Sequence, residues 1–324
     1  METVLAGLRA AAEPTRLRML ALLAQGDLTV SELTHILGQS QPRVSRHLKL
    51  MCDSGLLDRF PEGAWAFYRL AGEGAGAGLA RALLAQLPAG DPQLALDRDR
   101  LDAVRAARAA RAAAYFRDNA SRWNEIRSLH VAESEVEAAL LAAFAGRRPH
   151  DLVDMGTGTG RVLEVLAPRV ERAIGIDLSR EMLAVARANL DRAHLSHCMV
   201  RQGDITQLPL PAASADAVTI HQVLHYAADP AAVVAEAARV LRPGGLLVVV
   251  DFAPHQLEAL RDQHAHRRLG FADSEVSGWF ASAGLAADGA RHLPGKPLTV
   301  VLWQAHKPGT ASSRPALHHQ GAPA

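Results

Sequence analysis

Residues 151–160 of the chain read DLVDMGTGTG, and this stretch decides the fold of the larger part of the protein. The apolar residues from Leu152 to Met155 are typical of a short buried strand, and Asp154 lies near its carboxyl end. Three glycines then alternate with threonines before a helical pattern begins, at Gly156, Gly158 and Gly160. A strand that turns into a helix through glycines lets a ligand approach the backbone, because no Cβ blocks it. The stretch therefore predicts a strand–turn–helix unit that binds a ligand.

The spacing of acids and glycines separates two nucleotide-type ligands. Dinucleotide folds use G-x-G-x-x-G, with a pyrophosphate at the helix N-terminus and an acid about 20 residues further on. Here the spacing is G-x-G-x-G, and Asp154 stands before the first glycine, where a carboxylate repels a pyrophosphate but suits an ammonium group. Residues 172–177 read as the next strand and end in Asp177, which is placed to hold two ribose hydroxyls. One ribose and a cationic amino-acid tail describe S-adenosylmethionine better than NAD.

The later strand ends agree with this assignment. Asp204 follows a third predicted strand, where its carboxylate would accept a hydrogen bond from the adenine amino group. Residues 216–220 read as a fourth strand, and residues 246–251 read as a fifth after an RPGG turn at 242–245. With these motifs in this order, residues 115–307 resemble the class I S-adenosylmethionine-dependent methyltransferases. The resemblance implies an α/β, Rossmann-like domain with a mixed, mostly parallel seven-stranded sheet.

The expected ligand is S-adenosylmethionine or S-adenosylhomocysteine. Methyl transfer from a sulfonium depends mainly on proximity and orientation, sometimes with a base that removes a proton from the acceptor. His221 and His225 are the candidate bases, and packing is the alternative role for each. Tyr226, Asp251 and His255 belong to the same strand ends. The expected cofactor-binding residues are Tyr115, Asp154, Gly156, Gly158, Gly160, Asp177, Leu178, Asp204, Ile205 and His221.

Length and composition limit the remaining possibilities. A chain of 324 residues with 49% hydrophobic residues suggests two domains with sizeable cores. The sequence shows no apolar stretch long enough for a membrane span, and we expect no signal peptide. Cys52 and Cys198 are far apart, which argues against a disulfide framework and fits a reducing cytoplasm. The formal net charge is only +1, so any nucleic-acid signal must be local.

The first 70 residues carry such a local signal. Helical patterns at about 13–24, 29–38 and 41–54, with Gly26 and Gly38 between them, match a helix-turn-helix. No acid occurs between residues 33 and 52, so the third helix presents a polar face that can bond to phosphates and base edges. A β-hairpin follows as a wing, and Arg59 is its expected DNA contact. The expected contacts on the third helix are Gln41, Arg43, Ser45, Arg46, His47 and Lys49.

The phrases EPTRLRMLALL, SQPRVSRHLKLM and GAWAFYRL resemble the ArsR family of bacterial winged-helix repressors over residues 1–90. The resemblance implies a homodimer that reads a near-palindromic operator in double-stranded DNA. Many ArsR relatives sense metals through thiolates in the second helix, where this sequence has His35 and no cysteine. We therefore expect no metal site.

The domain prediction is a winged helix at 1–90, a helical linker at 91–114, a methyltransferase domain at 115–307 and a disordered tail at 308–324. The alanine–arginine pattern of the linker favours a solvated connecting helix over a DNA-binding patch. Three hypotheses for function remain. The chain is an ArsR-type regulator fused to a working methyltransferase with a small-molecule acceptor, a non-catalytic repressor that senses the cofactor, or a methyltransferase that uses its winged helix only to dimerise.

Overall fold

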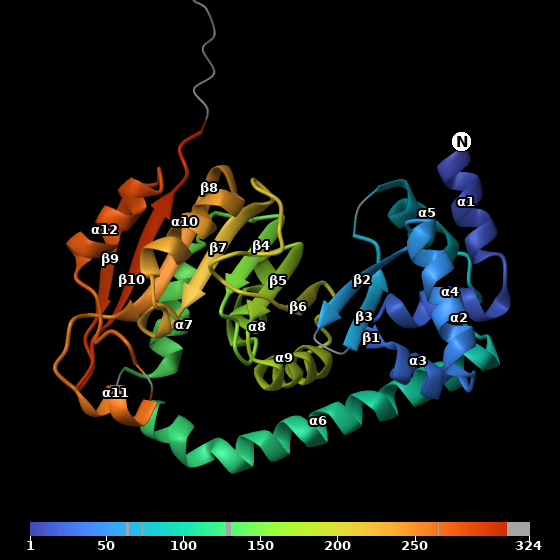
Figure 1. The fold of residues 1–324 in the computed structure, drawn as a ribbon, viewed down its shortest axis with the longest axis horizontal. Helices are drawn as coiled ribbons and strands as arrows, with labels where there is room; N and C mark the ends of the chain where they lie inside the picture. The colour runs from blue at the N-terminus through green and yellow to red at the C-terminus, as the bar shows by residue number, and fades with distance from the viewer. Residues whose placement is uncertain (63–64, 73, 128–130, 265, 310–324) are drawn as a thin grey trace, which may run out of the picture.

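The computed structural model describes the chain except residues 63–64, 73, 128–130, 265 and 310–324. It describes only the backbone of residues 62, 65, 109, 111–127 and 262–264. A winged helix and a larger α/β domain lie side by side, and one long helix runs beneath both (Figure 1). No helix among the described residues combines the length and the apolar character that a membrane span requires.

The N-terminal domain is a winged helix, as predicted. Its three-stranded sheet has the order β1-β3-β2. The turn into the second helix of the helix-turn-helix is fixed by a capping box, in which Glu32 N donates to Thr29 Oγ1 and Thr29 N donates to the Glu32 carboxylate. Gly38 ends this helix in the left-handed region, at φ 64°. The elements are α1 (Glu2–Ala11), α2 (Pro14–Leu23), β1 (Leu28–Thr29), α3 (Val30–Leu37), α4 (Gln41–Asp53), β2 (Leu57–Glu62), β3 (Trp65–Leu70) and α5 (Gly74–Leu84).

The C-terminal domain contains the predicted seven-stranded sheet, in the order β6-β5-β4-β7-β8-β10-β9. Strands β6, β5, β4, β7 and β8 pair in parallel, whereas β10 is antiparallel to both β8 and β9. From β4 the chain adds β5 and β6 on one side, and it then adds β7 and β8 on the other side of β4. Ligands of open α/β sheets bind at such a switch point, here between β4 and β7. The strands are β4 (Asp151–Met155), β5 (Arg172–Asp177), β6 (Cys198–Gln202), β7 (Ala215–His221), β8 (Leu241–Phe252), β9 (Ala286–Leu293) and β10 (Val300–His306).

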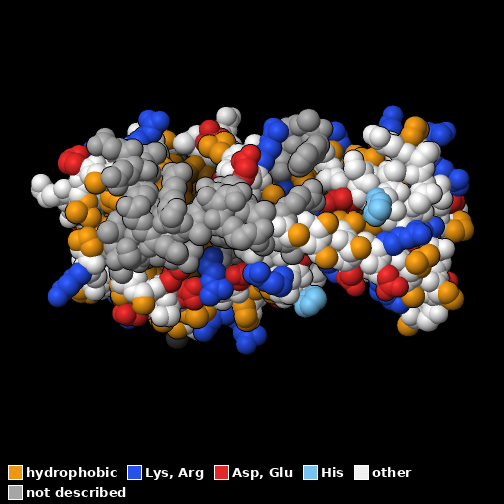
Figure 2. Space-filling model, turned by 90° about the horizontal axis from the view of Figure 1, so that it is seen from below, with side chains coloured by type: hydrophobic (Ala, Val, Ile, Leu, Met, Phe, Trp, Pro, Cys, Tyr) orange, Lys and Arg blue, Asp and Glu red, His pale blue; other side chains and the backbone are white. Residues whose placement is uncertain are grey.

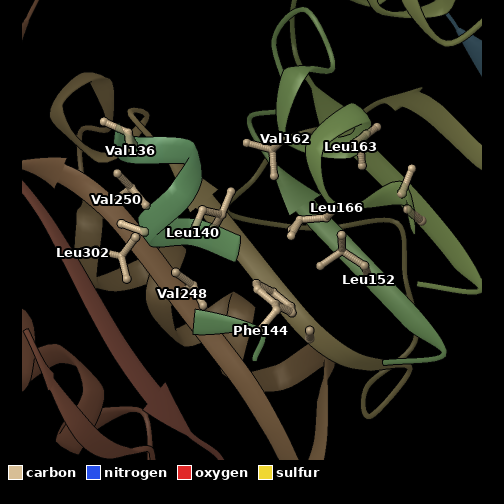
Figure 3. Packing of buried hydrophobic residues seen from close by; sticks show 14 of the residues in the cluster. Val136, Leu140, Phe144, Leu152, Val162, Leu163, Leu166, Val248, Val250 and Leu302 are labelled. Atoms are coloured by element: carbon tan, nitrogen blue, oxygen red, sulfur yellow. The ribbon is translucent and has the colours of Figure 1, made fainter. Parts of the chain in front are cut away.

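Two hydrophobic cores cover the two faces of this sheet. Alternate residues of β8 point to opposite faces, so Val248 and Val250 lie in one core and Leu247 and Val249 in the other. Figure 3 shows the first core, where Leu140 and Phe144 pack against the strands. The helices over the sheet are α7 (Glu133–Ala143), α8 (Arg161–Leu166), α9 (Arg180–Arg192), α10 (Pro230–Val240) and α12 (Asp273–Ser282).

The long helix is α6 (Pro92–Arg127), which crosses residue 115 without a break. Leu101 and Val104 are buried in the core of the winged helix. Asp97 is also buried, and Arg18 donates to it through Nε at 2.6 Å and Nη2 at 2.7 Å. The expectation of a solvated connecting helix is therefore wrong for this half of α6, which packs as part of the winged-helix domain.

Candidate functional site

The carboxyl ends of β4, β5 and β6 bring the predicted acids and the glycine loop to one edge of the sheet. Gly156 N and Thr157 N donate to the carbonyl oxygen of Ile176 at 2.7 and 3.0 Å, which folds the loop over the end of β5. Gly158 N donates to Asp177 Oδ2 at 2.9 Å. The loop after β4 and the acid after β5 therefore form one structural unit.

Two of the loop glycines lie in the left-handed region of the backbone, which other residues rarely adopt. Gly156 has φ 72°, and a Cβ added there would lie 2.4 Å from Val223 Cγ2. Gly158 has φ 52°, and a Cβ there would meet no atom within 4 Å. The first glycine allows close packing against the loop after β7, and the second leaves bare backbone facing open space.

Asp154 is more deeply buried than the sequence suggested, with 1% of its surface exposed. Its Oδ1 accepts a 2.7 Å hydrogen bond from the Thr219 hydroxyl, while its Oδ2 has no partner among the described residues. Burial raises the pKa of Asp154 to about 6, the hydroxyls of Thr157 and Thr219 act against this rise, and the charge of Asp177 adds to it. A buried carboxylate oxygen without a partner is costly, and an approaching cation would satisfy it.

The other predicted cofactor residues lie along the same edge. Asp177 Oδ1 accepts from Ser179 N at 2.8 Å, and the neighbouring Leu178 is 62% exposed. Asp204 is exposed, and hydrogen bonds from the backbone and hydroxyl of Thr206 lower its pKa. Ile205 is half-buried. Exposed apolar surface thus lies between carboxylates that can accept hydrogen bonds.

The remaining candidates differ from one another in their surroundings. The side chain of Tyr115 lies outside the described residues, and His221 is half-buried at the end of β7. His225 is buried in the short helix η2 (Leu224–Tyr226), and its Nδ1 lies 2.8 Å from the buried Asp251 Oδ1. His266 stacks on the His225 ring at 4.1 Å, a contact that no sequence motif indicated.

The predicted DNA-contacting face lies on the exposed side of α4, opposite the buried Val44, Leu48 and Met51. His47 is half-buried, with its Nδ1 at 3.4 Å from Arg16 Nη1. Arg59 on β2 is exposed. Seen from the side of α6, the described surface mixes basic and acidic side chains instead of forming one basic patch (Figure 2). The exposed side chains on α4 are Gln41, Arg43, Ser45, Arg46 and Lys49.

A buried arginine joins the two domains. Arg108 of α6 donates through Nε and Nη2 to the Glu32 carboxylate at 2.9 and 2.8 Å, and through Nη1 to Asp191 of α9 at 3.0 Å. Its Nη2 also donates to the carbonyl oxygen of Asp27 at 2.9 Å. Because Glu32 belongs to the capping box of α3, and α9 begins just after Asp177, Arg108 connects the helix-turn-helix to the helix that leaves the strand edge.

The wing is packed against the outer strand of the large sheet. Arg201 lies over the Phe60 ring, 3.3 Å from its centroid, and Arg187 lies over the Phe67 ring at 3.7 Å. Arg69 of β3 donates to the carbonyl oxygens of Ser196 and Cys198. Figure 1 shows β2 and β3 beside β6. The wing and the edge of the α/β domain therefore share one packed interface.

Comparison with known proteins matches two stretches of the chain to known families. Residues 13–59 match the family "Bacterial regulatory protein, arsR family", and residues 153–249 match the family "Methyltransferase domain". A "Probable S-adenosylmethionine-dependent methyltransferase" of Mycolicibacterium smegmatis is 34% identical over 164 residues, covering 46% of this chain and 61% of that protein. A demethylmenaquinone methyltransferase of Deinococcus radiodurans is 39% identical over 134 residues, covering 40% of this chain and 54% of that protein.

One solved structure with a similar fold is the YcgJ protein of Bacillus subtilis. It is 23% identical, has a TM-score of 0.47, and covers 54% of this chain and 100% of its own. The matched part of the chain spans 61% and 54% of the length of the two curated relatives. The two family matches cover separate parts of the chain. The chain thus carries an ArsR-family helix-turn-helix over residues 13–59 and a methyltransferase domain over residues 153–249, the latter similar to S-adenosylmethionine-dependent methyltransferases.

Proposed function

We propose that the protein is a DNA-binding transcriptional regulator whose methyltransferase domain binds S-adenosylmethionine and transfers its methyl group to a small molecule. The observation that carries the cofactor assignment is the meeting of Asp154, Asp177 and the glycine loop at the switch point of the sheet. The methyltransferase names of the relatives support the same reading.

The residues at the strand edge fit this cofactor. Asp154 Oδ2, buried without a partner among the described residues, would accept from the ammonium group of its amino-acid tail. Asp177 would accept from the ribose hydroxyls, and Asp204 from the adenine amino group. Leu178 and Ile205 offer apolar surface for the adenine ring. Tyr115 and His221 remain proposed pocket residues, and the bound cofactor would supply an activated methyl group.

The operator-binding function depends on the polar face of α4 and on dimerisation. The exposed α4 residues and Arg59 would contact double-stranded DNA, while the half-buried His47 would contribute from the edge of that face. Exposed apolar side chains at helical spacing form a stripe on α1 and its N-cap: Met1, Val4, Leu5 and Leu8. A second copy of the chain would cover this stripe, so we propose a homodimer. The free cysteines Cys52 and Cys198 fit a reducing compartment, and we propose that the protein acts in the cytoplasm.

The two activities have separate tests. Selection of duplexes from a random DNA pool should enrich one near-palindromic sequence with the wild-type chain but not with Arg43→Ala/Arg46→Ala. Labelled methyl should move from the cofactor to a component of a small-molecule extract. Enrichment that persists in the double variant would contradict the assignment of α4, and a fully bound cofactor that never loses its label would contradict turnover.

A second function, cofactor sensing without turnover, is favoured by the bridge through Arg108. Helix α9 begins beside Asp177 and reaches Arg108 through Asp191, and Arg108 holds Glu32 in the helix-turn-helix. A ligand that binds two arrangements of this bridge unequally would change operator affinity. In that case S-adenosylmethionine and S-adenosylhomocysteine should shift operator affinity unequally, and Asp177→Ala should remove the difference. Equal affinity with either ligand or with none would refute sensing.

The third hypothesis, a methyltransferase that uses its winged helix only to dimerise, has less support. It gives no reason for the exposed basic residues of α4, because a dimerisation face is depleted in charge at its centre.

A further inference from the structure

We propose that His225 and Asp251 form a proton-accepting pair that ionises a phenolic hydroxyl of the methyl acceptor. The inference rests on the proposed function, because it concerns the substrate of the same methyltransferase site. It names a class of acceptor for this chain, which the sequence motifs do not specify.

The first observation is the way in which Asp251 fixes the His225 ring. Asp251 is fully buried at the end of β8, and its Oδ1 lies 2.8 Å from His225 Nδ1. The same oxygen accepts from Phe252 N at 2.8 Å, and Oδ2 accepts from His225 N at 3.3 Å. A carboxylate in this position makes Nδ1 the donor, so Nε2 of the neutral ring is left as the proton acceptor.

The second observation is that only one ring nitrogen of His225, Nδ1, has a hydrogen-bond partner among the described residues. His225 is 2% exposed, and its Nε2 is not one of the fully buried polar atoms without a partner, so this atom reaches the surface. A polar group from outside the chain can therefore approach Nε2 while Asp251 holds the other side of the ring.

The third observation is the position of the pair and the character of its walls. Val223, which packs against Gly156 of the cofactor loop, immediately precedes η2, so the pair lies on the same edge as the glycine loop. The His266, Tyr226 and Phe252 rings surround His225, at centroid distances of 4.1, 4.1 and 5.4 Å. The backbone nitrogens of residues 267 and 268 donate to the His225 carbonyl oxygen, which ties a second segment across the site. Aromatic walls suit a flat, aromatic acceptor.

The chemistry follows from the proton balance. A carboxylate acceptor has no proton to lose, and a neutral amine can lose its proton after the transfer, so neither requires a base. A hydroxyl acceptor would give its proton to His225 Nε2 while its oxygen forms a bond to the methyl carbon. The electrons of the broken carbon–sulfur bond stay on sulfur, and the proton then leaves His225 for solvent. Asp251 acts as a positioning residue because it holds the tautomer and does not touch the acceptor.

The test uses 4-nitrophenol as a probe, because its phenolate absorbs visible light and its neutral form does not. The full chain is saturated with S-adenosylhomocysteine at a pH where the free probe is mostly neutral. We expect the probe to bind as the phenolate to the wild type, and the phenolate signal to fall to that of free probe in His225→Asn and Asp251→Asn. His306→Asn is the matched control, because His306 forms an exposed histidine–aspartate pair with Asp288 at 2.7 Å in the same domain.

Binding of S-adenosylhomocysteine, measured by calorimetry on every variant, separates this inference from the proposed function. Loss of that binding in the wild type would contradict the proposed function itself. Normal binding with no probe bound, or with equal phenolate signal in His225→Asn, would overturn the proton-accepting pair. Unchanged circular dichroism and cofactor affinity in His225→Asn show that a lost phenolate signal reflects chemistry and not unfolding.

Discussion

Replacing Arg108 with methionine removes the cation that joins the winged helix to the methyltransferase domain. The side chains of Arg108, Glu32 and Asp191 are 9%, 17% and 15% exposed, so the charges are largely shielded from solvent. Arg108 keeps the pKa of Glu32 below its usual value although burial acts in the opposite direction. Removing one partner of a buried ion pair costs about 3–5 kcal/mol, because the other charge stays buried.

We expect Arg108→Met to lower the free energy of unfolding by about 3 kcal/mol, near the lower end of that range. The lower end applies because Glu32 retains its hydrogen bonds to Thr29, and both carboxylates reach some solvent. Urea denaturation followed by circular dichroism measures the change. Arg98→Met on the exposed side of the same helix is the control, with an expected change within about 0.5 kcal/mol.

A charge-neutral variant tests the reasoning behind this magnitude. Arg108→Met combined with Glu32→Gln and Asp191→Asn removes these three charges. Arg105, which also pairs with Asp191, keeps Asp102 and the Gln25 carbonyl oxygen as partners, so most of the lost stability should return. A loss below about 1 kcal/mol in Arg108→Met, against the 3–5 kcal/mol typical of broken buried pairs, would refute the account, as would a triple variant no more stable than the single one.

Three further results are expected. The affinity for S-adenosylhomocysteine should fall as pH drops through about 6, by up to about tenfold per pH unit, because protonated Asp154 cannot hold an ammonium group. Calorimetry between pH 5 and 8 measures this affinity. An equal slope of affinity against pH in Asp154→Asn would exclude Asp154 as the cause. Arg43→Ala should weaken operator binding and lower the salt-dependence slope by about 1, whereas Arg98→Ala should change neither. Leu5→Glu should convert a dimer into a monomer in analytical ultracentrifugation with unchanged circular dichroism, and a dimer that persists would rule out the α1 stripe.

The local units of both domains could be predicted from the sequence because short motifs fix them. Glycines at alternate positions after an apolar strand determine the backbone of the loop between β4 and α8. The helix-turn-helix likewise follows from Thr29, Glu32 and Gly38, which cap both ends of α3. The glycine loop and the helix caps depend on residues close together in the chain, so a single sequence is sufficient to predict most of their structure.

The surroundings of the functional residues could not be predicted in the same way. The depth of Asp154 depends on Thr219 in the adjacent β7. An alanine–arginine pattern is the same on a solvated helix and on a helix whose arginines are buried. The burial of Arg108 could not be predicted because its partners come from α3 and α9, which are distant in the sequence. The sequence indicates His225 as a candidate base and places Asp251 at a strand end, but their pairing depends on how the ends of two parallel strands meet.

The central claim is that the protein holds a cofactor at the edge formed by β4, β5 and β6. Equilibrium dialysis of labelled S-adenosylhomocysteine against the full chain tests it most directly, with Asp177→Ala and the exposed Asp288→Ala as matched variants. The account predicts one ligand per chain in the wild type and in Asp288→Ala, and an affinity weaker by at least about tenfold in Asp177→Ala, because a hydrogen bond to a charged group contributes about 1.5–3 kcal/mol. No ligand bound by the wild type, or equal affinity in Asp177→Ala, would contradict it.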